Sequence, residues 1–163
     1  MEEELNFAYL AGYIDGDGCF YIDTVKAKTG KFPIVHRTVL KFASIDESVM
    51  IWLRDFLGVH YWTKVVSKKR KKFNRRNVFE ANVTGETLDK LLNRILPYLR
   101  IKKRHCEIMI KMRKTYPKPI KGVIRPSISK ETFDFRCVCH QELSSINTHK
   151  LSVPSAVSPS SLR

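Results

Sequence analysis

Apolar and small residues recur at helical spacing in the first segment of the chain. Phe7, Leu10 and Ile14 define one large apolar face of a helix predicted over residues 2–14. A second face carries very small side chains, and its members are Ala8, Ala11, Gly12 and Asp15. Because glycine lowers helix stability, we expect this face to approach another backbone closely, either a second helix or the sheet of the same chain.

Further along, the hydrophobic period changes to the alternation of strands with one buried face. It predicts strands at residues 19–28, 34–45, 61–69 and 77–84. Helical spacing predicts helices from about 47 to 57, from 84 or 85 to 96, over 100–116, and from about 129 to 146. Ser44 or Asp46 can cap the first of these helices, and Gly58 can end it. The element order α-β-β-α-β-β-α-α predicts an α+β fold, with a mixed sheet covered on one face by helices.

Composition divides the chain into three parts. Residues 1–116 carry the predicted core. Residues 117–147 combine a proline-containing linker with the last predicted helix. Residues 148–163 are rich in serine and proline, and we expect them to be disordered because they can bury little apolar surface.

The chain of 163 residues has a formal net charge of +14 and a pI near 9.8. This excess of positive charge favours a polyanionic partner, nucleic acid first and an acidic membrane surface second. No stretch is long and apolar enough to span a bilayer, so we expect no membrane partner. The four cysteines form no complete zinc-ligand pattern, so we expect free thiols.

Basic residues concentrate in the connection between the third and fourth predicted strands, which reads SKKRKKFNRRN. Such a run is often only a solvated surface. Here it lies at the tip of a hairpin, and strands of this kind fit the major groove of DNA. Polar neighbours, Glu80 among them, favour sequence reading over purely non-specific binding. The candidate DNA-binding residues are Tyr21, Asp23, Lys26, Lys28, Arg37, Val39, Lys41, Lys64, Lys68, Arg70, Arg75 and Asn77.

Two aspartates, Asp15 and Asp17, stand at the end of the first helix in the segment LAGYIDGDG. The C-terminal end of a helix carries partial negative charge, so this placement indicates a cation site. Carboxylate and backbone carbonyl oxygens are ligands that Mg²⁺ accepts, although DGDG is also a good turn sequence by itself. Lys102, in LRIKKRH, could stabilise charge on a phosphate, but taken alone it is one of 30 basic residues.

The segment LAGYIDGDG closely resembles the signature of the LAGLIDADG homing endonucleases in its length, its Ala-Gly step and both aspartates. One copy of the motif is present, so the resemblance is to the single-motif, homodimeric branch of the group I intron-encoded type, and it covers roughly residues 5–116. It implies the αββαββα fold, an antiparallel, saddle-shaped sheet with helices on one face, and extra C-terminal helices. By the same resemblance, the expected location is an organelle, chloroplast or mitochondrion.

The resemblance also implies roles for individual residues. Asp17 would bind divalent ions together with the carbonyl oxygen of Gly16, and two copies of Asp17 would meet near a dimer axis. Lys102 matches the catalytic lysine of the family, with Lys103 as its rival. Asp46 matches a catalytic position that orders water, unless it is only a helix cap. The dimer interface implied in this way consists of Ala8, Ala11, Gly12 and Asp15.

The implied activity is site-specific cleavage of double-stranded DNA. A homodimer would cut a long pseudo-palindromic site by metal-dependent phosphodiester hydrolysis and leave short 3′ overhangs. Mg²⁺ is the implied cofactor, with Mn²⁺ as a substitute and Ca²⁺ binding without cleavage, and no small-molecule cofactor is expected. The alternative is an intron-splicing maturase, or a DNA- or RNA-binding protein that does not cleave, on the same scaffold.

Overall fold

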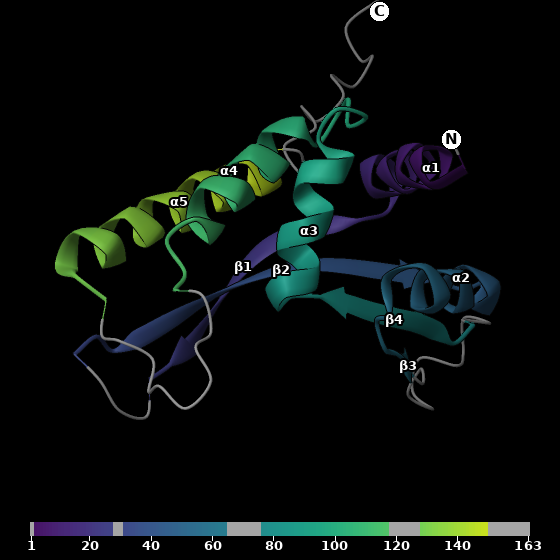
Figure 1. Cartoon of the computed structure of the whole chain (residues 1–163). Coiled ribbons are helices and arrows are strands. Elements are labelled where there is room, and N and C mark those ends of the chain that lie inside the picture. Colours follow the sequence, from purple (N-terminus) through teal and green to yellow (C-terminus); the bar gives the residue numbers. More distant parts are fainter. Residues whose placement is uncertain (1, 28–30, 65–75, 118–127, 150–163) are drawn as a thin grey trace, which may run out of the picture.

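The computed structural model describes residues 2–27, 31–64, 76–117 and 128–149 (Figure 1). The order of the helices and strands confirms the α+β fold expected from the sequence. Four of the predicted DNA-binding residues, Lys28, Lys68, Arg70 and Arg75, lie outside the described residues. The described elements are α1 (Glu2–Gly16), β1 (Cys19–Lys26), β2 (Ile34–Ser44), α2 (Glu47–Leu57), β3 (Tyr61–Lys64), β4 (Val78–Val83), α3 (Gly85–Ile95), α4 (Lys103–Arg113) and α5 (Lys130–His149).

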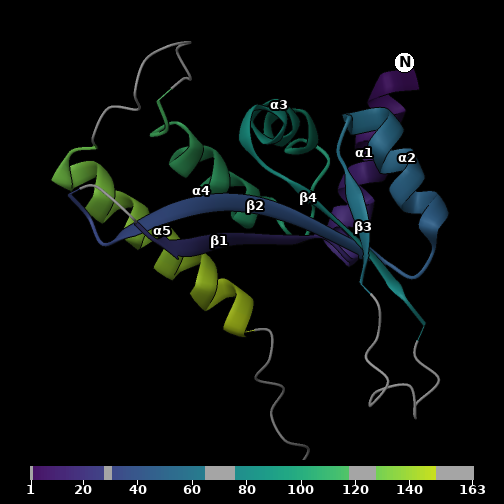
Figure 2. The ribbon, with the colours of Figure 1, turned by 90° about the horizontal axis from the view of Figure 1, so that it is seen from below.

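The strands form one antiparallel sheet in the order β1-β2-β4-β3. β1 pairs with β2, β3 pairs with β4, and β2 and β4 join the two hairpins, all in antiparallel orientation. The prediction of a mixed sheet is therefore wrong, and the antiparallel sheet implied by the family resemblance is confirmed. The central register pairs Leu40 with Val83 and Phe42 with Ala81. The free ends of the two hairpins point to opposite ends of the molecule (Figure 2).

The helices cover one face of this sheet and leave the other face open (Figure 1). On the covered face, Phe20, Leu40 and Phe42 share one core with Leu10 and Ile14 of α1. The later helices complete that core with Met50, Leu53, Leu88, Leu91, Leu92, Ile95, Ile108, Met109, Met112, Cys139 and Leu143. Since α5 contributes Cys139 and Leu143, it packs into the same core as the elements before it.

A tight turn joins the end of α1 to β1. The backbone amides of Asp17 and Gly18 donate to the carbonyl oxygen of Tyr13 at 2.8 and 3.3 Å. Gly18 folds back so closely that a Cβ atom there would lie 2.7 Å from the Cα of Ile14. Only glycine, which has no Cβ atom, can occupy this position. The close turn allows β1 to begin at the next residue, Cys19.

Several element boundaries differ from those expected. α4 begins at Lys103 rather than at residue 100, and the amides of residues 100–102 in the turn before it bond to the carboxylate of Asp15. α5 continues to His149, beyond Ile146. None of the described helices has the length and apolar character needed to cross a bilayer. All four cysteines are free thiols, as expected.

Candidate active site

The C-terminal end of α1 presents oxygen ligands to solvent. Gly16 is the last residue of the helix, Asp17 follows it, and both are exposed. A carboxylate beside a backbone carbonyl is a donor set suited to a hard divalent cation, so these residues fit the metal expected from the sequence. Among the described residues, no cluster of three or more His, Cys, Asp or Glu side chains can hold a metal ion.

Lys102 reaches this same helix end from a distant part of the chain. Its Nζ lies 2.7 Å from the carbonyl oxygens of Ile14 and Gly18, and 3.4 Å from that of Gly16. The carbonyls of Ile14 and Gly16 belong to the last turn of α1 and carry the partial negative charge of the helix C-terminus, which favours a cation there. The rival residue Lys103 is exposed at the start of α4. The geometry thus brings Lys102 to the motif, 3.4 Å from the Gly16 oxygen that the family resemblance assigns to a metal ion.

Asp15 is turned toward its own chain. Its carboxylate accepts hydrogen bonds from the amides of Arg100 at 2.7 Å, Ile101 at 3.1 Å and Lys102 at 2.8 Å. Partial burial disfavours the charged form, but these three bonds outweigh it and hold the pKa of Asp15 below its ordinary value. Sequence reasoning placed Asp15 in a dimer interface and missed this contact, because no local signal marks a partner 85 residues away.

Asp46 caps α2. Its Oδ1 accepts from the amide of Ser48 at 2.9 Å, and its own amide donates to Oγ of Ser44 at 2.9 Å. Hydrogen bonding to Ser48 holds the pKa of Asp46 below its ordinary value. Of the two roles considered from the sequence, the cap is the one present in this structure.

The outer face of α1 is exposed and partly apolar. Leu5 is 68% and Tyr9 58% exposed, and Gly12 is exposed between them and the helix end. A Cβ atom built on Gly12 or Gly16 would meet nothing within 4 Å. Ala8 lies at the edge of this face, whereas Ala11 is completely buried in the core with the large apolar residues. Ala11 therefore faces the interior of its own chain and does not belong to the outer face, because it lies about 100° around the helix from Gly12.

Side chains that alternate with the buried strand residues point to the open face of the sheet. Tyr21 is half-buried there, and burial raises its pKa. Asp23 and Arg37 are exposed directly opposite each other in the register. The open face thus offers donors and acceptors, as base-edge contacts require. The predicted residues that it contains are Tyr21, Asp23, Arg37, Val39, Lys41 and Lys64.

Three of the predicted DNA-binding positions differ from the exposed residues of the open face. Val39 is only 5% exposed, so it offers little surface to a ligand. Lys26 is exposed, but strand alternation places it on the side of Phe20 and Ile22 rather than on the open face. Asn77 is exposed immediately before β4.

Glu80 links two of the basic residues on the open face. Its carboxylate lies 2.8 Å from Nζ of Lys41 and 3.4 Å from Nζ of Lys64, and the residue is 8% exposed. The hydrogen bond from Lys41 holds the pKa of Glu80 below its ordinary value. Glu80 comes from β4, so its contact with both lysines depends on the strand order. The sequence marked Glu80 only as a polar neighbour.

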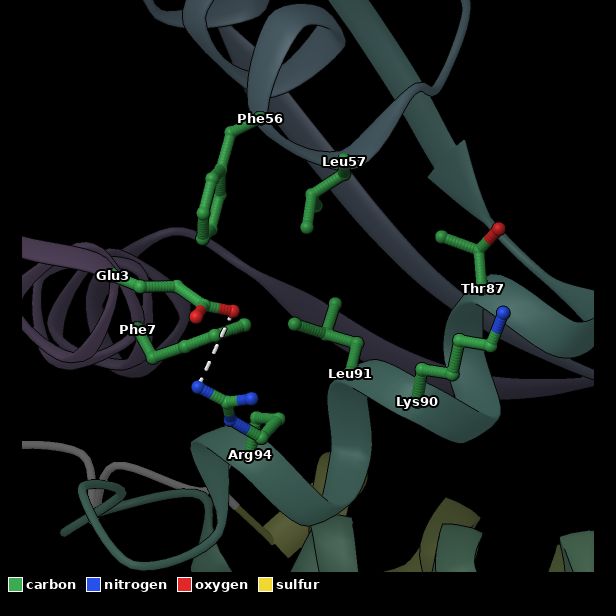
Figure 3. A pocket seen from close by; sticks show the side chains of 8 residues that line it. All are labelled: Glu3, Phe7, Phe56, Leu57, Thr87, Lys90, Leu91 and Arg94. Carbon is green, nitrogen blue, oxygen red and sulfur yellow. Dashed lines mark ion pairs between the residues drawn. The ribbon is translucent and has the colours of Figure 1, made fainter.

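A separate cavity of about 550 Å³ lies among α1, α2 and α3 (Figure 3). On one side of the cavity, Nη2 of Arg94 forms an ion pair with Oε1 of Glu3 at 3.3 Å. None of the predicted site residues lines this cavity. Its lining is Glu3, Phe7, Phe56, Leu57, Thr87, Lys90, Leu91 and Arg94.

Comparisons with known proteins identify the family and the fold of this chain. A family model described as LAGLIDADG endonuclease matches residues 10–109. The DNA endonuclease I-CvuI of Chlorella vulgaris is 26% identical over 120 residues, which are 72% of this chain and 69% of I-CvuI. The crystal structure of I-CvuI in complex with the I-CreI target matches with a TM-score of 0.58 at 18% identity, over 88% of this chain and 97% of that chain. The archaeal intron-encoded homing endonuclease I-Vdi141I, complexed with DNA, matches with a TM-score of 0.68 at 14% identity, over 88% and 84% of the two chains.

Proposed function

The chain belongs to the LAGLIDADG endonuclease family, and on this premise we propose that it is a site-specific DNA endonuclease that cuts both strands as a homodimer. The observation that carries the proposal is the contact of Lys102 Nζ with the carbonyl oxygens of Gly16 and Gly18, the two residues on either side of exposed Asp17 at the end of α1. An exposed carboxylate, a carbonyl oxygen and an ammonium group are the parts needed to hold a cation and to stabilise a phosphate.

We propose Mg²⁺ as the cofactor, held by the Asp17 carboxylate and the Gly16 carbonyl oxygen. When bound, a divalent ion supplies activation of water and stabilisation of the leaving oxygen. The chain's own contribution is positional: Asp17 presents its charge at an exposed turn, and Lys102 holds a positive charge beside it, where charge develops on the phosphate. Mn²⁺ is expected to substitute for Mg²⁺, and Ca²⁺ to bind without supporting cleavage.

The open face of the sheet is the proposed DNA surface. It carries exposed Asp23 and Arg37, together with the Lys41–Glu80–Lys64 cluster. The net charge of +14 favours a polyanion, and the mixture of acceptors with donors favours reading of base edges over phosphate binding alone. The DNA complexes of I-CvuI and I-Vdi141I support this assignment by their fold.

The outer face of α1 is the proposed dimer interface. The fold of one chain does not require glycine at position 12, since a Cβ atom added there would meet nothing within 4 Å. Glycine does allow a second helix to approach closely. In this proposal a second copy across this face brings its own Asp17 and Gly16 to the site, next to those of the first chain. Two-fold symmetry of the protein then implies a pseudo-palindromic DNA site.

The test is selection of cleaved sequences from a random double-stranded DNA library in Mg²⁺, with wild-type protein and Asp17→Asn in parallel. We expect wild type to yield pseudo-palindromic sites with short 3′ overhangs. Asp17→Asn keeps the size of the side chain but removes its charge, so cleavage should be lost while DNA affinity stays within about threefold of wild type.

The opposite results are equally clear. If wild type binds DNA of the library without generating ends, the protein is a binding protein on this scaffold and the nuclease proposal fails. If Asp17→Asn loses DNA affinity as strongly as cleavage, Asp17 is a folding or binding residue rather than a metal ligand.

A further inference from the structure

Asp15 ties the end of α1 to the turn that precedes α4. Its Oδ2 accepts from the amides of Arg100 and Ile101, and its Oδ1 accepts from the amide of Lys102. Lys102 is the N-cap of α4 but makes no side-chain capping bond, so the carboxylate at this helix start comes from another element. Charged acceptors make hydrogen bonds roughly twice as strong as neutral ones, and the N-terminus of a helix favours an anion.

The side chain of Lys102 returns to the same end of α1. Its ammonium group contacts the carbonyl oxygens of Ile14 and Gly18 at 2.7 Å, on either side of Asp15 in the sequence. The Asp15 carboxylate therefore accepts hydrogen bonds from the backbone of the 100–102 turn. Lys102, which belongs to that turn, in return donates hydrogen bonds to the backbone on either side of Asp15. We call this reciprocal pair the Asp15–Lys102 clasp.

We infer that Asp15 is a positioning residue, whose carboxylate fixes the 100–102 turn and thereby holds the Lys102 ammonium beside Asp17. The inference rests on the proposed function, in which Lys102 acts on the phosphate. Both Asp15 oxygens accept backbone hydrogen bonds, so the residue works as an anchor within one chain and not as a metal ligand or a dimer contact. A lysine stem is long and flexible, so its ammonium group keeps its place only if the backbone that carries it is fixed within reach of the carbonyl oxygens that it contacts.

Asp15→Asn tests the anchor at constant size. Asparagine has one acceptor oxygen, and its NH₂ group would face a backbone donor of the turn. We expect the single-turnover cleavage rate of the DNA-bound enzyme to fall about 10- to 100-fold, since small displacements of a catalytic group have effects of this order. Without DNA or metal, the amides of residues 100–102 should exchange with solvent faster than in wild type.

A double variant separates positioning from a general structural effect. If Asp15 acts through Lys102, adding Asp15→Asn to Lys102→Met should slow cleavage no further than Lys102→Met alone. Two effects that multiply would overturn the inference, because Asp15 would then act independently of the lysine.

Asp89→Asn is the matched control. Its carboxylate also joins two helices, accepting from Nε and Nη2 of Arg113 at 2.6 Å, but Arg113 is the last residue of α4, at the opposite end of that helix from Lys102. We expect Asp89→Asn to lower the melting temperature and to leave the cleavage rate within about twofold of wild type. If it slows cleavage as much as Asp15→Asn does, general loosening explains both variants and the inference fails.

Hydrogen exchange of Lys102→Met decides the question even if Asp15→Asn does not fold. Asp15 should still protect the amides of residues 100–102 in this variant. Loss of that protection would mean that the lysine holds the turn, which overturns the inference. This measurement needs no cleavage, so it distinguishes a failed clasp from a failed assignment of nuclease activity.

Discussion

Individual residues of the LAGYIDGDG segment have different physical tasks within a short stretch of chain. Gly12 leaves the backbone of α1 uncovered on its outer face. Asp15 anchors a distant turn, and Gly18 allows the chain to fold back on the helix. Asp17 lies exposed between the last two. The proposed metal ligand is thus flanked on both sides by residues that fix the backbone, which limits the movement of its carboxylate.

Gly18→Ala should destabilise the protein by about 1–3 kcal/mol, the usual effect of overpacking. Its new Cβ would lie 2.7 Å from the Cα of Ile14, a backbone atom that cannot move without distorting α1. Denaturant unfolding measures this effect. Gly16→Ala is the control, because a Cβ there meets nothing within 4 Å, and it should be neutral or stabilising by up to about 1 kcal/mol. Equal stability of the two variants would contradict the close contact at Gly18.

At the scale of elements, α1 has two faces with different partners. Its inner face places Phe7, Leu10 and Ile14 in the core of the chain. Its outer face leaves Leu5 and Tyr9 more than half exposed beside a glycine that the monomer does not require. Apolar exposure together with a bare backbone is what close packing of two helices needs, so the second face is suited to another copy of the same helix.

Gly12→Leu should convert the proposed dimer to a monomer. The leucine has room within its own chain, so the fold should be retained, but it would keep the backbone of a second helix at a distance. Sedimentation velocity measures the association, and far-UV circular dichroism checks the fold. Lys111→Leu, an exposed change on α4, is the control and should remain dimeric. A dimer that survives Gly12→Leu would remove α1 from the interface.

At the scale of the whole molecule, the sheet separates two environments. Its open face carries the polar and charged residues proposed for DNA, and its covered face holds the core. α5 extends the cover over the β1–β2 hairpin, where Phe133 stacks on Phe32 at 4.3 Å between ring centroids. The hairpin that presents Asp23 and Arg37 is therefore supported from behind by the last helix.

Acid should weaken this support through His36. The residue is 1% exposed, and burial, followed by the charges of His140 and Arg136, holds its pKa below the ordinary value of 6.5. The unfolded chain therefore binds a proton more readily than the folded protein. Stability contributed by neutral His36 should be present above pH 6.5 and should be lost as the pH falls through the pKa of the folded state.

Denaturant unfolding over this pH range provides the measurement, with His36→Gln as the comparison because it does not titrate. The variant should show a weaker decline of stability on acidification than wild type. Identical pH dependence in the two proteins would show that protonation of His36 does not govern it. Cys137, whose Sγ lies 3.8 Å from Nε2 of His36, should be left unchanged in both.

The sequence by itself determined the features that depend on near neighbours. The apolar spacing of α1, the Asp46 cap of α2 and the left-handed Gly58 that ends it, with φ of 66°, all act over a few residues and could be predicted. The motif LAGYIDGDG also identified the end of α1 as the candidate site, because its residue types and order are specific. These signals persist in any chain that keeps the same local pattern.

Only the tertiary structure decided which distant residues meet. It placed Lys102 rather than Lys103 at the motif, turned Asp15 toward the 100–102 turn, and put Ala11 inside the core. It also joined Glu80 of β4 to Lys41 of β2. Such contacts depend on strand order, register and the packing of helices on the sheet. Those are set by burial summed over the whole core, so no local pattern in the sequence encodes them.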